Sequence, residues 1–311
     1  MDQTILRKEA KVHHLTDITL QHPRVFHVEC DRFPESTYII ESPGALHILL
    51  QPWLVGSQLA NSARLSTVDF LRVAYHLVPE LRKTTFANIT EVVPLAGALY
   101  YSTAEAFEIV FGETINRCFI GAKRHPSPIG WVTELSYKNF EAFPESPVVI
   151  VGDTIATGGT IEGILETVVE QASDIQAIVI YSIAGGILGA VRMKKFADKE
   201  EIPLYMFFSN AIFGVESNGT DMPWLHPGTI VTPSIRQQAE SVYGPDLGKR
   251  WCSIWDWGDR AKHPLKHLDE LLERCKLEIS LNPDEATARI LNAIIAEATK
   301  AVESLKSSPR L

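Results

Sequence analysis

The chain has 311 residues, of which 45% are hydrophobic and 22% charged, as in globular proteins that bury a sizeable core. Its formal net charge of −9 argues against an extended basic surface for nucleic acid, although a few local cations and helix-end amides suffice for a small phosphorylated ligand. The first residues, MDQTILRKEAKVHHL, lack the apolar core of a secretory signal. We therefore expect a cytoplasmic protein with neither a membrane nor a nucleic-acid partner.

The cysteines are far apart and form no Cys-x-x-Cys pair, and no histidine cluster has the spacing of a zinc site. We expect reduced, structural thiols at all four positions, Cys30, Cys118, Cys252 and Cys275. No metal site built from protein thiolates is expected.

The first quarter of the chain changes from irregular to helical patterning. Residues 16–55 alternate apolar and polar stretches between prolines and are expected to form a few strands with loops, with an edge sheet as one arrangement. Residues 66–83 begin with Ser66 and Thr67 as a cap and continue with apolar residues at helical spacing. They predict an amphipathic helix that starts at Ser66.

From residue 89 onward, short apolar strands alternate with helices. Strands are expected in ITEVVPLAG, INRCFIGAKR, PVVIV, IQAIVIYSIAG and IPLYMFF. The helix after Ser102 carries Glu105 in capping-box spacing, and residues 125–147 form a long connection that could be a mobile hairpin. This alternation predicts an α/β fold with a parallel sheet of about five strands flanked by helices.

Ligands bind at the carboxyl ends of the strands in such sheets. This placement brings Ala96 and Gly97, Arg124, the loop at Asp153, and Ser209 with Asn210 to one edge. Two C-terminal helices, from Leu265 and from Asp284, are expected to cover a core or make a dimer contact. We divide the chain into an N-terminal extension with strands (1–60), a central α/β domain (61–262) and a C-terminal helical extension (263–311).

The stretch VVIVGDTIATGGTIEGIL, residues 148–165, has the features of a phosphate-binding turn. A buried strand leads into a loop with two threonines and two glycines, and a helix follows whose first N–H groups favour an anion. Asp153 precedes this turn at a distance suited to the two hydroxyls of a sugar, so the pattern indicates a ribose 5-phosphate group. The turn lacks the lysine of a P-loop and the G-x-G-x-x-G of a dinucleotide fold, and a glycine-rich turn without ligand is the alternative.

The same stretch resembles the 5-phosphoribosyl 1-diphosphate (PRPP) signature of type I phosphoribosyltransferases. Over about residues 60–260 the resemblance extends to uracil phosphoribosyltransferases, with PLAGALYY similar to their diphosphate loop and FIGAKRHPSP to their strand ending in Gly-x-x-Arg. It implies the type I fold with a hood that binds the base, a homodimer, and transfer of ribose 5-phosphate to a ring nitrogen of uracil or a similar heterocycle. Diphosphate would be released, and Mg²⁺ would be carried by PRPP.

The resemblance also implies roles for individual residues. Asp153 and Arg124 would be catalytic. The ribose 5-phosphate would be bound by Asp153, Ala156, Thr157, Gly158, Gly159 and Thr160. The diphosphate would be bound by Ala96, Gly97, Lys123 and Arg124, and the base by Tyr243, Gly244, Asp246 and Gly248. Residues 125–147 would form a flap that excludes water.

Three departures from the family pattern keep other functions open. Gly152 stands at the first of two acidic positions, Leu95 stands where the uracil enzymes have arginine, and the base segment survives only loosely, in VYGPDLG and WGDR. A regulatory homologue that binds PRPP without catalysis is therefore one alternative. A specialised phosphoribosyltransferase for an unusual aromatic acceptor is another.

Overall fold

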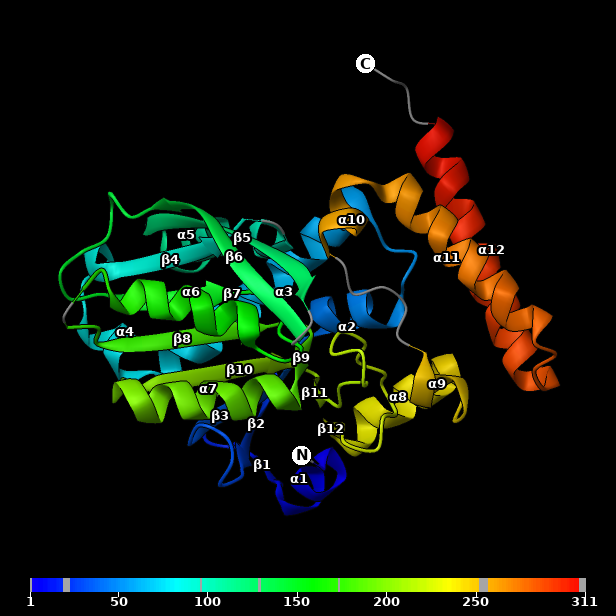
Figure 1. Cartoon of the computed structure of the whole chain (residues 1–311), viewed down its shortest axis with the longest axis horizontal. Coiled ribbons are helices and arrows are strands. Elements are labelled where there is room, and N and C mark those ends of the chain that lie inside the picture. Colours follow the sequence, from blue (N-terminus) through cyan, green and yellow to red (C-terminus); the bar gives the residue numbers. More distant parts are fainter. Residues whose placement is uncertain are drawn as a thin grey trace.

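The computed structural model describes residues 2–18, 23–95, 97–127, 130–172, 174–251 and 257–307. Its centre is a nine-stranded sheet with the order β1-β2-β3-β10-β8-β7-β4-β5-β6 (Figure 1). The strands are β1 (Lys11–His14), β2 (Arg24–Glu29), β3 (Ser36–Glu41), β4 (Ile89–Pro94), β5 (Asn116–Ser127), β6 (Gly130–Asn139), β7 (Val148–Gly152), β8 (Ala177–Ser182) and β10 (Leu204–Ser209). A small second sheet has the order β12-β11-β9, made by β12 (Ile230–Val231), β11 (Ala211–Phe213) and β9 (Gly185–Gly186).

The expectation of about five parallel strands is corrected to nine strands in a mixed sheet. The six strands from β3 to β5 in the sheet order run parallel, whereas β1, β2 and β6 are antiparallel additions. The sequence analysis treated β6 as part of a connection because its alternating polar residues do not form an apolar run. Residues 16–55, expected to form a few strands with loops, contribute β2 and β3 to this sheet, and β3 pairs with β10.

Two hydrophobic cores lie on the two faces of the sheet, because successive residues of each strand point to opposite sides. Val148 and Ile150 of β7 face one core, and Val149 and Val151 face the other. The first core is covered by α2 (Pro43–Leu50), α3 (Gly56–Leu77) and α5 (Thr103–Phe111). The second is covered by α6 (Gly159–Val169) and α7 (Ile187–Glu200).

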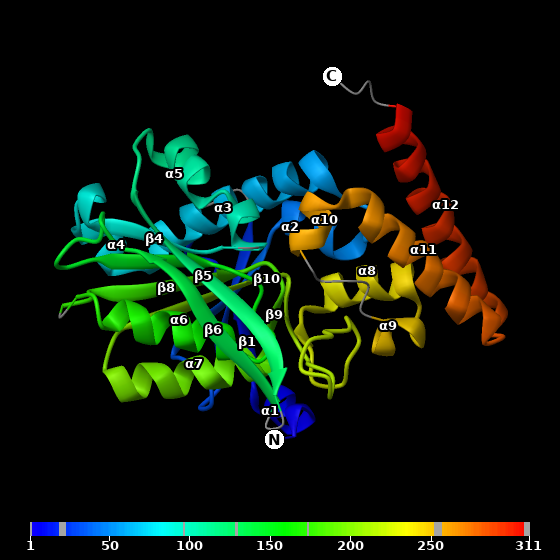
Figure 2. The same ribbon diagram turned by 45° about the horizontal axis from the view of Figure 1, so that its top comes forward.

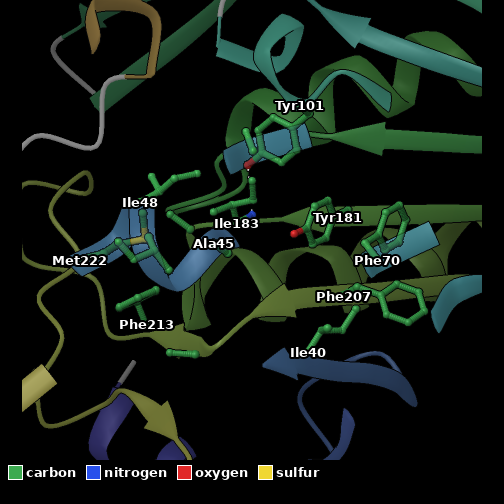
Figure 3. Close-up of a cluster of buried hydrophobic side chains, with 14 of the residues drawn as sticks. Ile40, Ala45, Ile48, Phe70, Tyr101, Tyr181, Ile183, Phe207, Phe213 and Met222 are labelled. Atoms are coloured by element: carbon green, nitrogen blue, oxygen red, sulfur yellow. Dashed lines mark hydrogen bonds between the residues drawn. The ribbon is translucent and has the colours of Figure 1, made fainter. Parts of the chain in front are cut away.

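Aromatic side chains fill the first core between α3 and the sheet (Figure 3). Phe70 of α3 stacks on Tyr181 of β8 with ring centroids 4.4 Å apart. The Tyr181 hydroxyl also makes hydrogen bonds with Ser66 and Ser209, so three buried polar groups satisfy one another.

Two helix starts differ from the sequence prediction. Helix α3 begins at Gly56, ten residues before Ser66, because Ser66 and Thr67 are buried and use their hydroxyls inside the core instead of capping. Ser102 has the left-handed conformation (φ +51°) and makes no side-chain cap, so the expected capping box with Glu105 does not form.

The C-terminal part is helical, as predicted. It comprises α8 (Pro233–Tyr243), α9 (Leu247–Arg250), α10 (Trp257–Lys262), α11 (Pro264–Ser280) and α12 (Glu285–Ser307). Asp284 caps α12 by accepting the Thr287 N–H at 2.9 Å. Helices α11 and α12 pack side by side, away from the large sheet in both views (Figures 1 and 2).

The remaining elements are α1 (Gln3–Glu9), α4 (Pro79–Lys83) and the 3₁₀ helices η1 (Phe86–Asn88) and η2 (Gly97–Tyr101). The boundary expected at residue 60 falls inside α3, and the boundary expected at residue 262 falls between α10 and α11. None of the helices in the described part of the chain has an apolar stretch of the length that a bilayer crossing requires.

Candidate functional site

The candidate site lies where the connections of the sheet change direction. Strands β4 and β7 are parallel neighbours, yet the chain continues from β4 to β5 on one side and from β7 to β8 on the other. Open α/β sheets bind ligands in the crevice at such a switch point, outside the carboxyl ends of the strands. The loop after β7 is the Asp153 loop that the sequence analysis singled out.

Backbone hydrogen bonds fix this loop to the segment between β8 and α7. The Ile155 N–H donates to the Ala184 carbonyl at 3.1 Å, and the Gly189 N–H donates to the Ala156 carbonyl at 3.0 Å. A Cβ on Gly186 would lie 2.6 Å from the Ala156 oxygen, so this close backbone approach requires glycine there. One side of the loop is thus fixed by hydrogen bonds to the chain around Ala184 and Gly189, and its other side lines a pocket.

The pocket is formed by the turn into α6 and has a volume of about 280 Å³. Gly158 has a φ of +80°, which favours glycine, and α6 begins at Gly159 with no side-chain cap at its N-cap residue. The first N–H groups of a helix need partners from outside the helix, and an anion can supply them. The lining residues are Thr133, Thr154, Ile155, Ala156, Thr157, Gly158, Gly159, Thr160, Ile161 and Arg192. We call residues 156–160 the cradle.

Arg192, on α7, adds a cation to this pocket that the sequence analysis did not identify. Its guanidinium donates to the Glu162 carboxylate at 2.6 Å, and Nη1 lies 3.7 Å from the Cβ position of Gly159. In the sequence Arg192 stands among other cations of an amphipathic helix, Lys194 and Lys195, and nothing in the pattern distinguishes it. Only the packing of α7 beside α6 brings it to the cradle.

The β5–β6 hairpin reaches the same pocket. Thr133 of β6 lies with its Oγ1 3.3 Å from the Oγ1 of Thr160. The expected flap, residues 125–147, thus includes the end of β5 and all of β6, and Thr133 of β6 contacts the cradle. A ligand at the cradle would meet this hairpin.

Asp153 stands directly before the lining residues, and its Oδ1 accepts the Thr154 N–H at 2.8 Å. The absence of a carboxylate at Gly152 has a steric cause. A Cβ there would lie 2.9 Å from Cδ1 of Tyr101, a fully buried residue whose hydroxyl oxygen accepts the Ile183 N–H at 3.1 Å (Figure 3). Burial raises the pKa of the Tyr101 hydroxyl, which remains protonated.

The residues expected to bind diphosphate follow β4 and lie in β5. Gly97 opens η2, directly after β4, and Ala96 lies outside the described residues. Lys123 is exposed and pairs in register with Glu134, and Arg124 pairs in register with Thr133, which lines the pocket. The side chain of Arg124 lies outside the described part of the structure.

The residues expected to bind the base lie on α8 and α9. Tyr243 is 2% exposed and donates its hydroxyl to the Leu50 carbonyl at 3.1 Å, so its side chain serves packing. Gly244 ends α8 with a φ of +68°, and Gly248 packs against Leu225. Asp246 is exposed and pairs with Lys249 at 3.3 Å.

Another segment lies against the cradle instead. A Cβ on Gly219 would be 3.4 Å from Cγ2 of Thr157. The sequence analysis did not assign Gly219 to the site.

Metal-binding groups are sparse in the described ranges. They contain no group of three or more His, Cys, Asp or Glu side chains that could hold a metal ion. Cys30, Cys118 and Cys275 are free thiols, and burial raises the pKa of Cys118 to about 11; Cys252 lies outside the described residues. The single carboxylate of Asp153 fits an ion held mainly by ligand oxygens, as Mg²⁺ on a diphosphate is.

Comparison with known proteins finds similarity among solved structures. No family model and no curated protein matches the sequence. Among solved structures, the chain is similar to adenine phosphoribosyltransferase from Trypanosoma brucei (12% identity over 67% of this chain and 79% of that chain, TM-score 0.35). It is also similar to adenine phosphoribosyltransferase from Saccharomyces cerevisiae (15% identity over 66% of this chain and 97% of that chain, TM-score 0.33). A third similar structure is a hypothetical protein from Neisseria gonorrhoeae with bound ppGpp (10% identity over 50% of this chain and 82% of that chain, TM-score 0.29). The functional assignment therefore depends on the residues of the site.

Proposed function

We propose that the protein is a phosphoribosyltransferase that moves ribose 5-phosphate from PRPP to a ring nitrogen of a nucleobase and releases diphosphate. The main support is the pocket at the switch point, where the uncapped start of α6 and the Arg192 guanidinium surround a space of about 280 Å³ directly after Asp153. The sequence resemblance of residues 148–160 to the PRPP signature gives the same assignment independently of the pocket.

The cradle would hold the 5-phosphate. Backbone N–H groups at the helix start and the hydroxyls of Thr157 and Thr160 supply donors, and the glycines allow the anion to approach closely. The Arg192 guanidinium would either leave Glu162 to bind the phosphate or donate hydrogen bonds to both groups.

Asp153 would accept hydrogen bonds from the ribose hydroxyls and stabilise positive charge on the ring. In the transfer, the bond from C1 to diphosphate breaks with its electron pair on the diphosphate, a base nitrogen bonds to C1, and the base loses a proton. Arg124, Lys123 and the turn at Gly97 would neutralise the diphosphate, and Mg²⁺ carried by PRPP would add charge there. Positioning and electrostatic stabilisation would provide most of the rate.

For the acceptor, the sequence resemblance supports uracil or a uracil-like heterocycle. Because Tyr243 is buried, Asp246 and the adjacent backbone are the groups near α8 and α9 that remain to contact the base. The loop around Gly219 lies beside Thr157. The acceptor chemistry is therefore best found by direct assay.

Diphosphate release tests this function. The protein is incubated with PRPP, Mg²⁺ and single bases, including uracil, adenine, hypoxanthine and guanine, and diphosphate is measured. We expect release that depends on one base and on PRPP. A protein that does not bind PRPP and releases no diphosphate with any base would contradict the proposal.

A second candidate function is binding of PRPP without catalysis. It is favoured by the Tyr101 ring, which fills the space that a side chain at Gly152 would need and so leaves one carboxylate at the loop. Tight PRPP binding without diphosphate release for any acceptor would support it. Turnover only with an unusual aromatic acceptor would identify a specialised transferase.

A further inference from the structure

The N-terminal helix α1 is joined to a distant loop by one side chain. The Gln3 carboxamide donates from Nε2 to the Val215 carbonyl at 2.7 Å and accepts the Val215 N–H on Oε1 at 2.8 Å. The two residues are 212 positions apart in sequence. A carboxamide carries both an NH₂ donor and an oxygen acceptor, so it can make both hydrogen bonds to one residue.

Val215 begins a compact loop, residues 215–221. Inside it the Glu216 N–H donates to the Asp221 carbonyl at 2.8 Å, and the Gly219 N–H donates to the Glu216 carbonyl at 2.9 Å. Asn218 Oδ1 accepts the N–H groups of the last two residues of the loop at 3.0 and 2.9 Å. These internal hydrogen bonds hold the loop together as one unit, so its position depends on its contacts with the rest of the protein, such as those of Gln3.

This loop lies beside the cradle at Gly219 and reaches it indirectly, through Gly186, at Val215. Val215 is 2% exposed and packs on Gly186, where an added Cβ would lie 2.5 Å from Val215 Cγ2 and 2.6 Å from the Ala156 carbonyl. Gly219 lies beside Thr157, since a Cβ added to Gly219 would be 3.4 Å from the Thr157 methyl group. A shift of the loop would therefore move the wall behind Ala156 and Thr157.

Helix α1 is itself held firmly. Leu6 is 4% exposed and belongs to the second core, and Asp2 caps the helix through the Thr4 N–H at 2.9 Å. On its other side, a Cβ on Gly228 would lie 2.7 Å from Cβ of Gln3. The helix is thus a fixed support from which Gln3 reaches the loop.

We propose that Gln3 is a positioning residue that fixes the 215–221 loop against the cradle and so maintains the geometry of the ribose 5-phosphate site. The inference rests on the proposed function, because it takes the cradle as the site of that ligand. Gln3 does not contact the ligand and acts through Val215.

Gln3→Met tests the proposal, because it keeps the length of the side chain and its packing on Gly228 and removes both hydrogen bonds. Gln3→Glu is the second variant, since a carboxylate can accept the Val215 N–H and cannot donate to its carbonyl. Lys8→Ala, an exposed change on the same helix, is the control. Two quantities are measured: amide hydrogen exchange in peptides covering residues 215–221, and the affinity for ribose 5-phosphate by calorimetry.

We expect exchange in the loop to become about tenfold faster and ribose 5-phosphate to bind about tenfold more weakly in both Gln3 variants, on the scale of a lost hydrogen bond, with no change in the control. Unchanged exchange, or faster exchange with unchanged affinity, would overturn the positioning role. Wild-type protein that does not bind ribose 5-phosphate would refute the proposed function and the role of Gln3 at that ligand. The exchange rates would then still show whether the two Gln3 hydrogen bonds hold the 215–221 loop in place.

Discussion

At the level of single residues, Asp153 carries the chemical step of the proposed reaction. Its carboxylate follows β7 directly and already accepts one backbone N–H, from Thr154. We expect Asp153→Asn to lower PRPP-dependent turnover by about two orders of magnitude, the scale of losing one preorganised electrostatic group. Steady-state diphosphate release measures this, and wild-type rates in the variant would show that the ribose assignment is wrong.

Arg192 supplies charge to a cradle that is otherwise made of backbone and hydroxyl groups. We expect Arg192→Gln to weaken binding of ribose 5-phosphate by about tenfold or more, as for loss of a charged hydrogen bond. Lys195→Gln, the same charge change on an exposed part of α7, is the matched control. Calorimetric titration with ribose 5-phosphate measures the affinity of both variants. Equal affinities would show that Arg192 does not bind the phosphate.

Gly152 and Tyr101 form a steric pair. A methyl group at residue 152 would lie 2.9 Å from the buried Tyr101 ring, so we expect Gly152→Ala to lower the free energy of unfolding by about 1–3 kcal/mol through overpacking. Adding Tyr101→Ala should cost less in this variant than in the wild type, because the clash is relieved. Urea unfolding measures both, and an alanine variant of wild-type stability would contradict the pairing.

The sequence predicted some residues of the site and missed others for a geometric reason. Asp153 and residues 156–160 belong to one short segment, so their spacing after an apolar strand could be read directly. Arg192 and Thr133 come from α7 and β6, and they reach the cradle only through the packing of these elements on α6. The close approach of the Tyr101 ring to Gly152 likewise has no sign in the sequence.

At the level of elements, the segment that links β11 to β12 depends on a neutral histidine. His226 Nδ1 accepts the Gly228 N–H at 3.0 Å, and the ring packs where a Cβ on Gly214 would be. Burial lowers the pKa of His226 below its ordinary value, and the Glu216 carboxylate opposes this effect. The folded protein therefore favours the neutral ring, whereas the unfolded chain takes up a proton below about pH 6.5.

The free energy of unfolding should accordingly decrease as the pH falls through about 6.5. In His226→Gln, which keeps a hydrogen-bond acceptor and has no titrating ring, this part of the decrease should be absent. Urea unfolding of both proteins at pH 7.5 and 5.5 tests the point. A stability difference between them that is the same at both pH values would contradict it.

The success of the element predictions followed hydrophobic patterning. Strands β7 and β8 with their helices, and the two helices α11 and α12, were predicted because their apolar patterning is clear. Strand β6 and the true start of α3 were not, since β6 is polar on alternate residues and Ser66 is buried where a cap was expected. Tertiary contacts, which local sequence does not show, decide such cases.

At the level of the whole molecule, the site is assembled from segments far apart in the chain. The switch point between β4 and β7 sets its place, the β5–β6 hairpin and α7 close it, and α1 supports the loop beside Thr157. The sequence indicated the parallel order of the central strands, and it could not indicate the pairing of Gln3 with Val215, because nothing in either local segment marks the other.

The crystal structure of the protein with ribose 5-phosphate is the most direct test of the central claim. We predict the phosphate within hydrogen-bonding distance of the N–H groups of residues 157–160 and the Arg192 guanidinium, with the ribose hydroxyls on the Asp153 carboxylate. A ligand bound elsewhere, or a cradle closed by the protein's own side chains, would contradict the account.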